Sequence, residues 1–103
     1  MKPSRLDREA AKELFEAAEW YESRQPGLAE RLFDEIDHHL ALVRERPSAF
    51  PILQVSPPDL AIRRALLDKF PYALVFLELE SEIRTIAVAH HKRRPNYWLS
   101  RIL

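Results

Sequence analysis

Hydrophobic residues recur at intervals of three and four along the first half of the chain, which is the spacing of one face of an α-helix. The first stripe consists of Ala10, Leu14, Ala17, Ala18 and Tyr21. Asp7 precedes it, where an N-cap side chain would accept hydrogen bonds from free backbone N–H groups. The acidic residues on the other side of this helix are expected to face solvent: Glu9, Glu13, Glu16 and Glu19. A helix is therefore predicted from Asp7 to about residues 23–25.

A second helical stripe follows the Pro26-Gly27 break and ends at Pro47: Ala29, Leu32, Phe33, Ile36, Leu40 and Val43. Because the connection is short, the two helices are expected to form an antiparallel hairpin. Gly27 is the only glycine in the chain, so it is the one position where a positive φ costs little. His38 and His39 are adjacent on this helix and point about 100° apart, which makes them poor joint metal ligands and favours structural roles.

The hydrophobic period changes after residue 60. Residues 47–59 contain four prolines and are predicted to be a connector with at most a short edge strand at 52–55. Strands are predicted at 62–67, 72–79 and 83–89, and the middle one, YALVFLEL, is apolar on both faces, as a central strand is.

Pro95 is expected to lie in the first turn of a short C-terminal helix that packs through Tyr97, Trp98 and Ile102. The order of elements predicts an α+β fold. An N-terminal helical hairpin packs on one face of a twisted antiparallel β-sheet of three to four strands, and the short helix follows.

Composition narrows the class of protein. The chain has 103 residues, of which 47% are hydrophobic, which predicts one domain over residues 1–103 with a packed core. Cysteine is absent, so disulfides, thiolate metal sites and a catalytic thiol are excluded. No apolar run reaches the ~18 residues of a membrane span, and the N-terminal residues lack the apolar core of a signal peptide. We therefore expect a cytoplasmic protein.

The formal net charge of zero hides two oppositely charged halves. Residues 1–60 carry eight basic and twelve acidic side chains, a net charge of −4, and residues 61–103 carry eight and four, a net charge of +4. Such segregation is typical of a basic face for a nucleic acid or an acidic partner, and also of two ordinary solvated faces.

The sequence lacks the motifs of common phosphate-binding and metal-binding sites. One glycine cannot build a phosphate-binding loop, and no HExxH motif exists. His90 and His91 are neighbours at a strand end, so their rings are expected on opposite faces. No cofactor and no metal are therefore expected.

The segment HHKRRPNYW, residues 90–98, has the densest candidate chemistry. Cations can contact phosphate and aromatic rings can stack on bases. Alternatively, Tyr97 and Trp98 close the end of the core while the three cations of residues 92–94 face water. Arg63 and Arg64 lie on a neighbouring strand and point to opposite faces, so only one of them can join this cluster.

Four segments follow one another from about Asp7 to Trp98: AAKELFEAAEWYESRQPGLAERLFDEID, RERPSAFP, AIRRALLDKFPYALVFLELESEIRTIAVAHHKRR and PNYW. In the order of these segments, the sequence resembles the RelE/ParE superfamily, the toxins of type II toxin–antitoxin modules. The resemblance implies a helical hairpin on a twisted sheet and an additional N-terminal strand. Pro3 would confine that strand to a short sheet edge.

The superfamily implied by this resemblance has two activities: RelE-like members cut mRNA in the ribosome, and ParE-like members poison DNA gyrase. Cutting members tend to carry a catalytic Arg directly after the Tyr that opens the central strand. Here Tyr72 is followed by Ala73, which favours a non-enzymatic, ParE-like toxin of the plasmid-stabilisation type. Two alternatives stay open. One is a metal-independent endoribonuclease that uses Arg63, His91, Arg93 and Tyr97, and the other is an inactive member that only binds an antitoxin.

The resemblance also implies a partner and a binding surface. A cognate antitoxin would neutralise the toxin in a hetero-oligomer, without a membrane, cofactor or metal. DNA gyrase, or alternatively the ribosome with its mRNA, would be the target. The residues expected to contact the target or the antitoxin are Arg63, Arg64, Lys92, Arg93, Arg94 and Trp98.

Overall fold

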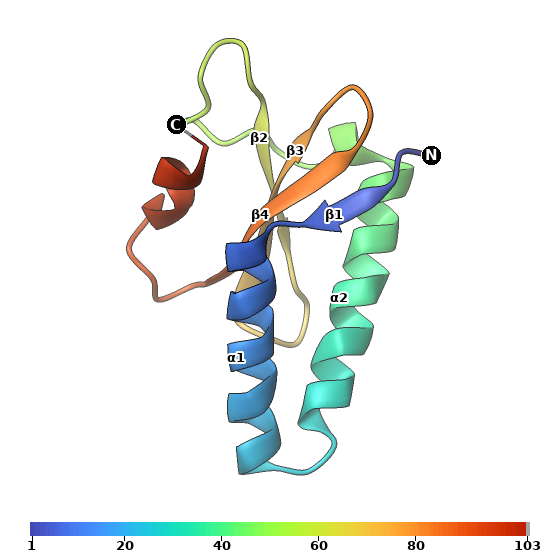
Figure 1. Cartoon of the computed structure of the whole chain (residues 1–103), viewed down its shortest axis with the longest axis vertical. Helices are drawn as coiled ribbons and strands as arrows, with labels where there is room; N and C mark the ends of the chain where they lie inside the picture. The colour runs from blue at the N-terminus through green and yellow to red at the C-terminus, as the bar shows by residue number, and fades with distance from the viewer. Residues whose placement is uncertain (103) are drawn as a thin grey trace.

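The two hydrophobic stripes form α1 (Arg8–Arg24) and α2 (Leu28–Glu45), which pack together as a hairpin in the computed structural model (Figure 1). The structure describes residues 1–102. Gly27 has φ of 95°, and its N–H donates to the Glu22 carboxylate at 3.1 Å, so the predicted reversal is confirmed. Neither helix, nor any other within residues 1–102, is long and apolar enough to cross a membrane.

The sheet contains β1 (Ser4–Leu6), β2 (Ile62–Leu66), β3 (Tyr72–Glu78) and β4 (Ile83–His90) in the order β1-β4-β3-β2. The three predicted strands pair antiparallel, and the α+β fold is confirmed. The short N-terminal strand pairs parallel with β4, so the sheet is mixed rather than wholly antiparallel. A parallel pair needs a crossover connection, and the helical hairpin that follows β1 begins one.

Two segments outside the sheet differ in detail from the expectation. The predicted edge strand at 52–55 is reduced to one bridge between Ile52 and Arg63. The C-terminal helix is a 3-10 helix, η2 (Tyr97–Arg101), which begins after Asn96 rather than at Pro95. Another 3-10 turn, η1 (Pro47–Ala49), follows α2.

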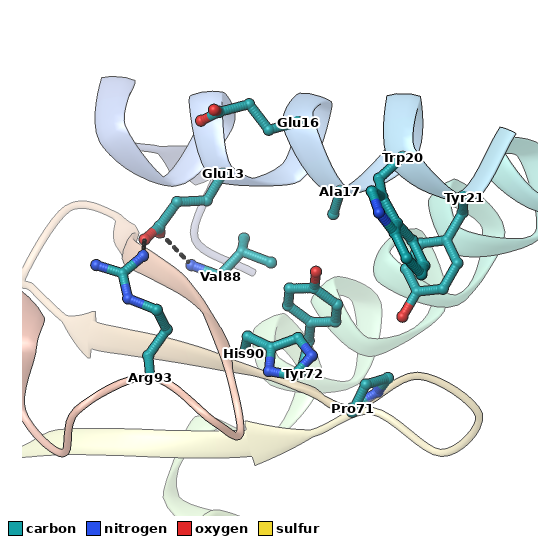
Figure 2. A pocket seen from close by; sticks show the side chains of 10 residues that line it. All are labelled: Glu13, Glu16, Ala17, Trp20, Tyr21, Pro71, Tyr72, Val88, His90 and Arg93. Carbon is teal, nitrogen blue, oxygen red and sulfur yellow. Dashed lines mark hydrogen bonds and ion pairs between the residues drawn. The ribbon is translucent and has the colours of Figure 1, made fainter. Parts of the chain in front are cut away.

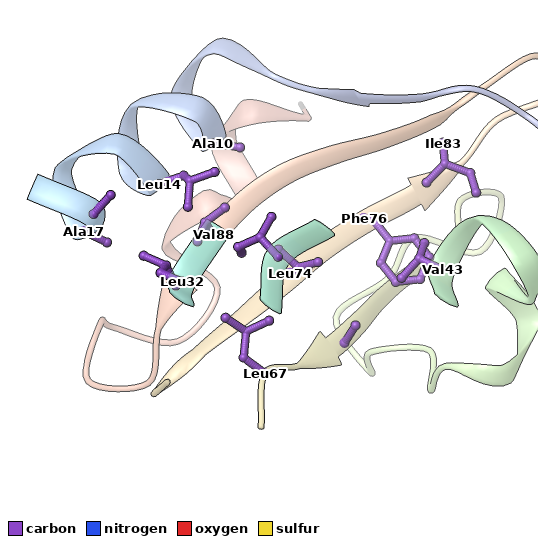
Figure 3. Close-up of a cluster of buried hydrophobic side chains, with 13 residues drawn as sticks. Ala10, Leu14, Ala17, Leu32, Val43, Leu67, Leu74, Phe76, Ile83 and Val88 are labelled. Carbon is purple, nitrogen blue, oxygen red and sulfur yellow. The ribbon is translucent and has the colours of Figure 1, made fainter. Parts of the chain in front are cut away.

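Hydrophobic side chains fill both faces of the sheet. The larger cluster lies between the helical hairpin and the sheet and includes Leu14, Leu32, Leu74, Phe76 and Val88 (Figure 3). The smaller cluster lies on the opposite face, under η2 and the connector, and includes Ile62, Val75, Leu77, Ile86 and Trp98. The sheet is therefore the middle of three layers, because η2 and the connector cover part of the face that α1 and α2 leave open.

Asp7 precedes α1 as expected, but its carboxylate does not cap the helix. It instead accepts bonds from Arg84 on β4, with Nε at 2.9 Å from both oxygens and Nη2 at 2.8 Å from Oδ2. The Asp7 N–H donates to the carbonyl of Thr85 at 2.8 Å. Nε and Nη2 of one guanidinium both bind the carboxylate, a charge-assisted and geometrically specific contact, so Asp7 links the start of α1 to the sheet.

Candidate functional site

Most residues of the segment 90–98, together with side chains of the sheet, line a groove of about 180 Å³ on the sheet face opposite the helices, which we call the C-terminal groove. Arg64, His91, Arg93, Arg94, Tyr97 and Trp98 are among the residues that line it. The left-handed φ of 62° at Asn96 turns the chain after β4, and η2 then packs on the outer face of the sheet. Asparagine tolerates this conformation better than most residues.

Of the eight predicted site residues, six line the C-terminal groove and two do not. Arg63 lies on the helix side of β2, where Nη1 donates to the carbonyl of Phe50 at 2.7 Å. Arg64 pairs with Val75 on the outer face and reaches the groove. Lys92 is exposed at the turn after β4, and its N–H donates to His90 Nδ1 at 3.0 Å.

Trp98 lines the groove and packs against the outer face of the sheet. Its side chain is only 4% exposed and belongs to the outer-face cluster with Val75 and Ile86. Tyr97 is half-buried beside it. Tyr97 and Trp98 therefore close the end of the core, as the alternative interpretation of residues 90–98 predicts. Arg94 and His91 are exposed at the surface.

Glu13 is the centre of a polar network that the sequence did not predict, and its expected solvent-facing position is wrong. Its side chain is 13% exposed and accepts hydrogen bonds from Val88 N–H at 3.0 Å, from Arg101 at 3.0 Å and from the Tyr97 hydroxyl. Arg93 stacks over the Tyr97 ring at 3.9 Å and lies 4.0 Å from the Glu13 carboxylate.

The reason for this network lies at the edge of the sheet. β1 pairs with β4 only as far as Thr85, so the rest of β4 has an open edge. Glu13 takes the Val88 N–H at that edge, and Arg101 Nη1 donates to the Ile86 carbonyl at 2.9 Å. Two side chains thus replace the missing strand, and they satisfy backbone groups that would otherwise stay unpaired.

The network also fixes the protonation of Tyr97. Burial, and then the hydrogen bond to the Glu13 carboxylate, raise the pKa of the Tyr97 hydroxyl far above its usual value. The phenol therefore stays protonated and donates to Glu13 at neutral pH.

A second cavity, of about 620 Å³, lies between α1 and the end of β4, and we call it the helix–sheet pocket (Figure 2). Trp20 and Tyr21 line it from α1, opposite Tyr72 and His90 of the sheet. The rings of Tyr72 and His90 meet edge to face at 4.9 Å. Burial, and then the nearby charges of His91 and Lys92, lower the pKa of His90.

Sequence reasoning missed most of the helix–sheet pocket. Trp20 is 53% exposed on the face of α1 that carries the acidic residues. A large aromatic residue outside the hydrophobic stripe of a helix is the signal that could have found it.

The family model described as the ParE toxin of type II toxin-antitoxin system, parDE, matches residues 5–95. The fold is similar to a solved chain of the chromosomal ParDE TA system from P. aeruginosa, with a TM-score of 0.72 and 18% sequence identity. That similarity covers 87% of this chain and 96% of the other. No functionally curated protein matches the sequence significantly.

Proposed function

Because the chain belongs to the family of ParE toxins of type II toxin–antitoxin systems, we propose that it inhibits growth by binding an essential target, DNA gyrase, and not by cutting RNA. The observation that carries this proposal is that the side chains that RNA cleavage would use do not all reach one site, because Arg63 lies on the other face of the sheet. General acid–base catalysis needs groups that converge on the same reacting atoms.

The four candidate ribonuclease residues do not converge in that way. Arg63 is bound to the Phe50 carbonyl on the helix side of the sheet, whereas His91, Arg93 and Tyr97 line the C-terminal groove on the other side. The Tyr97 hydroxyl donates to Glu13, and its raised pKa keeps it protonated. Ala73 supplies no cation beside Tyr72.

Exposed cations beside the C-terminal groove supply the binding surface of this proposal. Arg64, Lys92 and Arg94 are exposed, and within residues 1–102 none of them forms an ion pair. Unpaired cations on one surface favour an acidic partner surface and accelerate its association. We assign them to contacts with the target, and we assign Arg63 and the buried Trp98 to positioning.

A cognate antitoxin is the second partner, since a ParE toxin is one half of a toxin–antitoxin pair. We propose that an apolar segment of the antitoxin binds the helix–sheet pocket, where Trp20, Tyr21 and Tyr72 offer aromatic surface. Aromatic side chains in such pockets commonly dominate binding energy. The result would be a neutralised hetero-oligomer in the cytoplasm, where gyrase also resides.

The first experiment is induced expression of the chain in a bacterial host, alone and together with the antitoxin gene. Expression alone should stop growth, and co-expression should restore it. Normal growth on expression alone would instead identify an inactive family member and would overturn the proposal.

The second experiment is a supercoiling assay with purified gyrase. We expect the native chain to inhibit gyrase and the double variant Arg64→Ala/Arg94→Ala to inhibit it at least about tenfold less, equivalent to about 1.4 kcal/mol of binding. Arg31→Ala, an exposed cation on α2, is the matched control and should inhibit normally. Growth arrest with codon-position cuts in ribosome-bound mRNA and intact gyrase activity would establish the ribonuclease alternative.

A further inference from the structure

Glu35, His39 and Asp68 come together away from both cavities described above, where α2 passes the connection between β2 and β3. One donor atom from each side chain lies within 4.8 Å of the other two. Glu35 and His39 are four residues apart on α2, so their side chains lie on the same face. Asp68 approaches them from the β2–β3 connection.

The His39 ring is held in one orientation. Its side chain is buried, and Nδ1 lies 2.9 Å from the backbone carbonyl of Glu35. A carbonyl oxygen only accepts hydrogen bonds, so Nδ1 carries the proton, and the neutral ring has its lone pair on Nε2. Nε2 lies 3.8 Å from Asp68 Oδ1, too far for a hydrogen bond. In the neutral ring, therefore, the Nε2 lone pair and an Asp68 oxygen face the same gap.

The Glu35 carboxylate is fixed as well. It accepts hydrogen bonds from the backbone N–H groups of Asp68 and Lys69, the latter at 3.1 Å from both oxygens. Carboxylates that bind metals are commonly held by such bonds, and histidines that bind metals commonly donate their other ring N–H to a carbonyl. Both supporting contacts are in place here.

We propose that Glu35, His39 and Asp68 form a binding site for one divalent transition-metal cation, with Zn²⁺ preferred to Mg²⁺. Imidazole nitrogen and carboxylate oxygen are ordinary Zn²⁺ ligands, whereas Mg²⁺ prefers oxygen ligands in an octahedral arrangement. Three protein ligands leave a fourth position for water. The inference is independent of the toxin's target, since it concerns residues outside both cavities.

The exposure of the site and the freedom of the Asp68 side chain are both compatible with binding of a metal ion. Glu35 and Asp68 line a cavity of about 710 Å³, so two of the three ligands are open to solvent, while the buried His39 lies behind them. The Asp68 side chain is 75% exposed, so it can move to shorten the gap to Nε2 without disturbing the core. An ion there would tie α2 to the β2–β3 connection.

The test is calorimetric titration of the purified, untagged, metal-free full-length chain with Zn²⁺ and with Mg²⁺ at pH 7. We expect one Zn²⁺ per chain and at least tenfold weaker binding of Mg²⁺. Asp68→Asn should weaken Zn²⁺ binding by about tenfold or more, since even the loss of an outer-shell partner commonly costs about 10–100-fold. Asp59→Asn, an exposed carboxylate in the connector, is the matched control and should bind normally.

Two further results would decide the same question. His39→Gln should abolish binding, and His38→Gln, which changes the exposed neighbouring histidine, should not. Because His39 is buried and its loss could impair folding, the exposed Asp68 keeps the test interpretable. Absence of saturable Zn²⁺ binding by the native chain, or equal affinity in Asp68→Asn, would overturn the proposal.

Discussion

The carboxylate of Glu13 on α1 accepts the backbone N–H of Val88 on β4, beyond the point where β1 stops pairing with that strand. A side chain from a helix thus satisfies a strand's free edge. The same carboxylate holds Arg101 and Tyr97, so the helical layer, the sheet and the C-terminal segment meet at one residue.

Replacing Glu13 should therefore destabilise the protein far more than its place on an acidic helix face suggests. Glu13→Ala leaves the Val88 N–H, the Arg101 guanidinium and the Tyr97 hydroxyl without their acceptor. We expect a loss of about 3 kcal/mol in the free energy of unfolding, measured by urea denaturation. Glu16→Ala, an exposed acid one turn along, should change it by less than about 0.5 kcal/mol. Equal effects of the two substitutions would contradict the network.

Because the pKa of Tyr97 is raised, we expect the free energy of unfolding to fall at alkaline pH. The unfolded tyrosine ionises near pH 10, whereas the folded one keeps its proton to a higher pH. The stabilisation is therefore fully present below about pH 10 and is lost above it, by about 1.4 kcal/mol per pH unit, until the folded group also ionises. The stability advantage of the native chain over Tyr97→Phe should shrink between about pH 10 and 11. An advantage that stays constant across this range would contradict the assignment.

Substitutions of the two tryptophans should have different effects, one on the stability of the fold and the other on antitoxin binding. Trp98 is buried, so Trp98→Ala should cost about 3–5 kcal/mol of unfolding free energy. Trp20 is half exposed in the helix–sheet pocket, so Trp20→Ala should cost little stability but weaken antitoxin binding by at least about tenfold. Denaturation and calorimetric titration with the antitoxin measure the two effects. Normal antitoxin binding by Trp20→Ala would place the antitoxin elsewhere.

Thr85 offers a substitution that should stabilise the fold. Its side chain is fully buried in β4, and within residues 1–102 its hydroxyl has no hydrogen-bond partner. Thr85→Val keeps the branched shape and removes the unpaired hydroxyl, so we expect a gain of about 1 kcal/mol. Thr85→Ser, which keeps the hydroxyl and removes a methyl group, should lose stability. A loss with valine would show that the hydroxyl has a partner in solution.

The helical hairpin was predictable because the spacing of hydrophobic residues within each helix determines which face is buried. The stripe of Ala10, Leu14 and Ala17 reports the buried face of α1 directly, and each of these residues is buried. The same logic failed for Glu13. Its burial depends on where β1 ends relative to β4, which the spacing of residues along α1 does not contain.

Strand alternation correctly separated Arg63 from Arg64 but could not say which of them faces the C-terminal segment. That choice depends on which sheet face the helices cover, a relation between distant parts of the chain. The pairing of Glu35 with His39 at helical spacing was visible in the sequence. Asp68, by contrast, lies far along the chain, and only the tertiary structure brings it to this pair.

The pairing of β1 with β4 has a consequence for synthesis on the ribosome. The first strand of the chain docks against the last one, so the sheet can be completed only when nearly all residues have left the ribosome. The helical hairpin can form earlier, but the C-terminal groove is built from β4 and the residues after it. A chain that terminates before β4 therefore lacks the strand that joins β1 to β3, and it cannot build this groove.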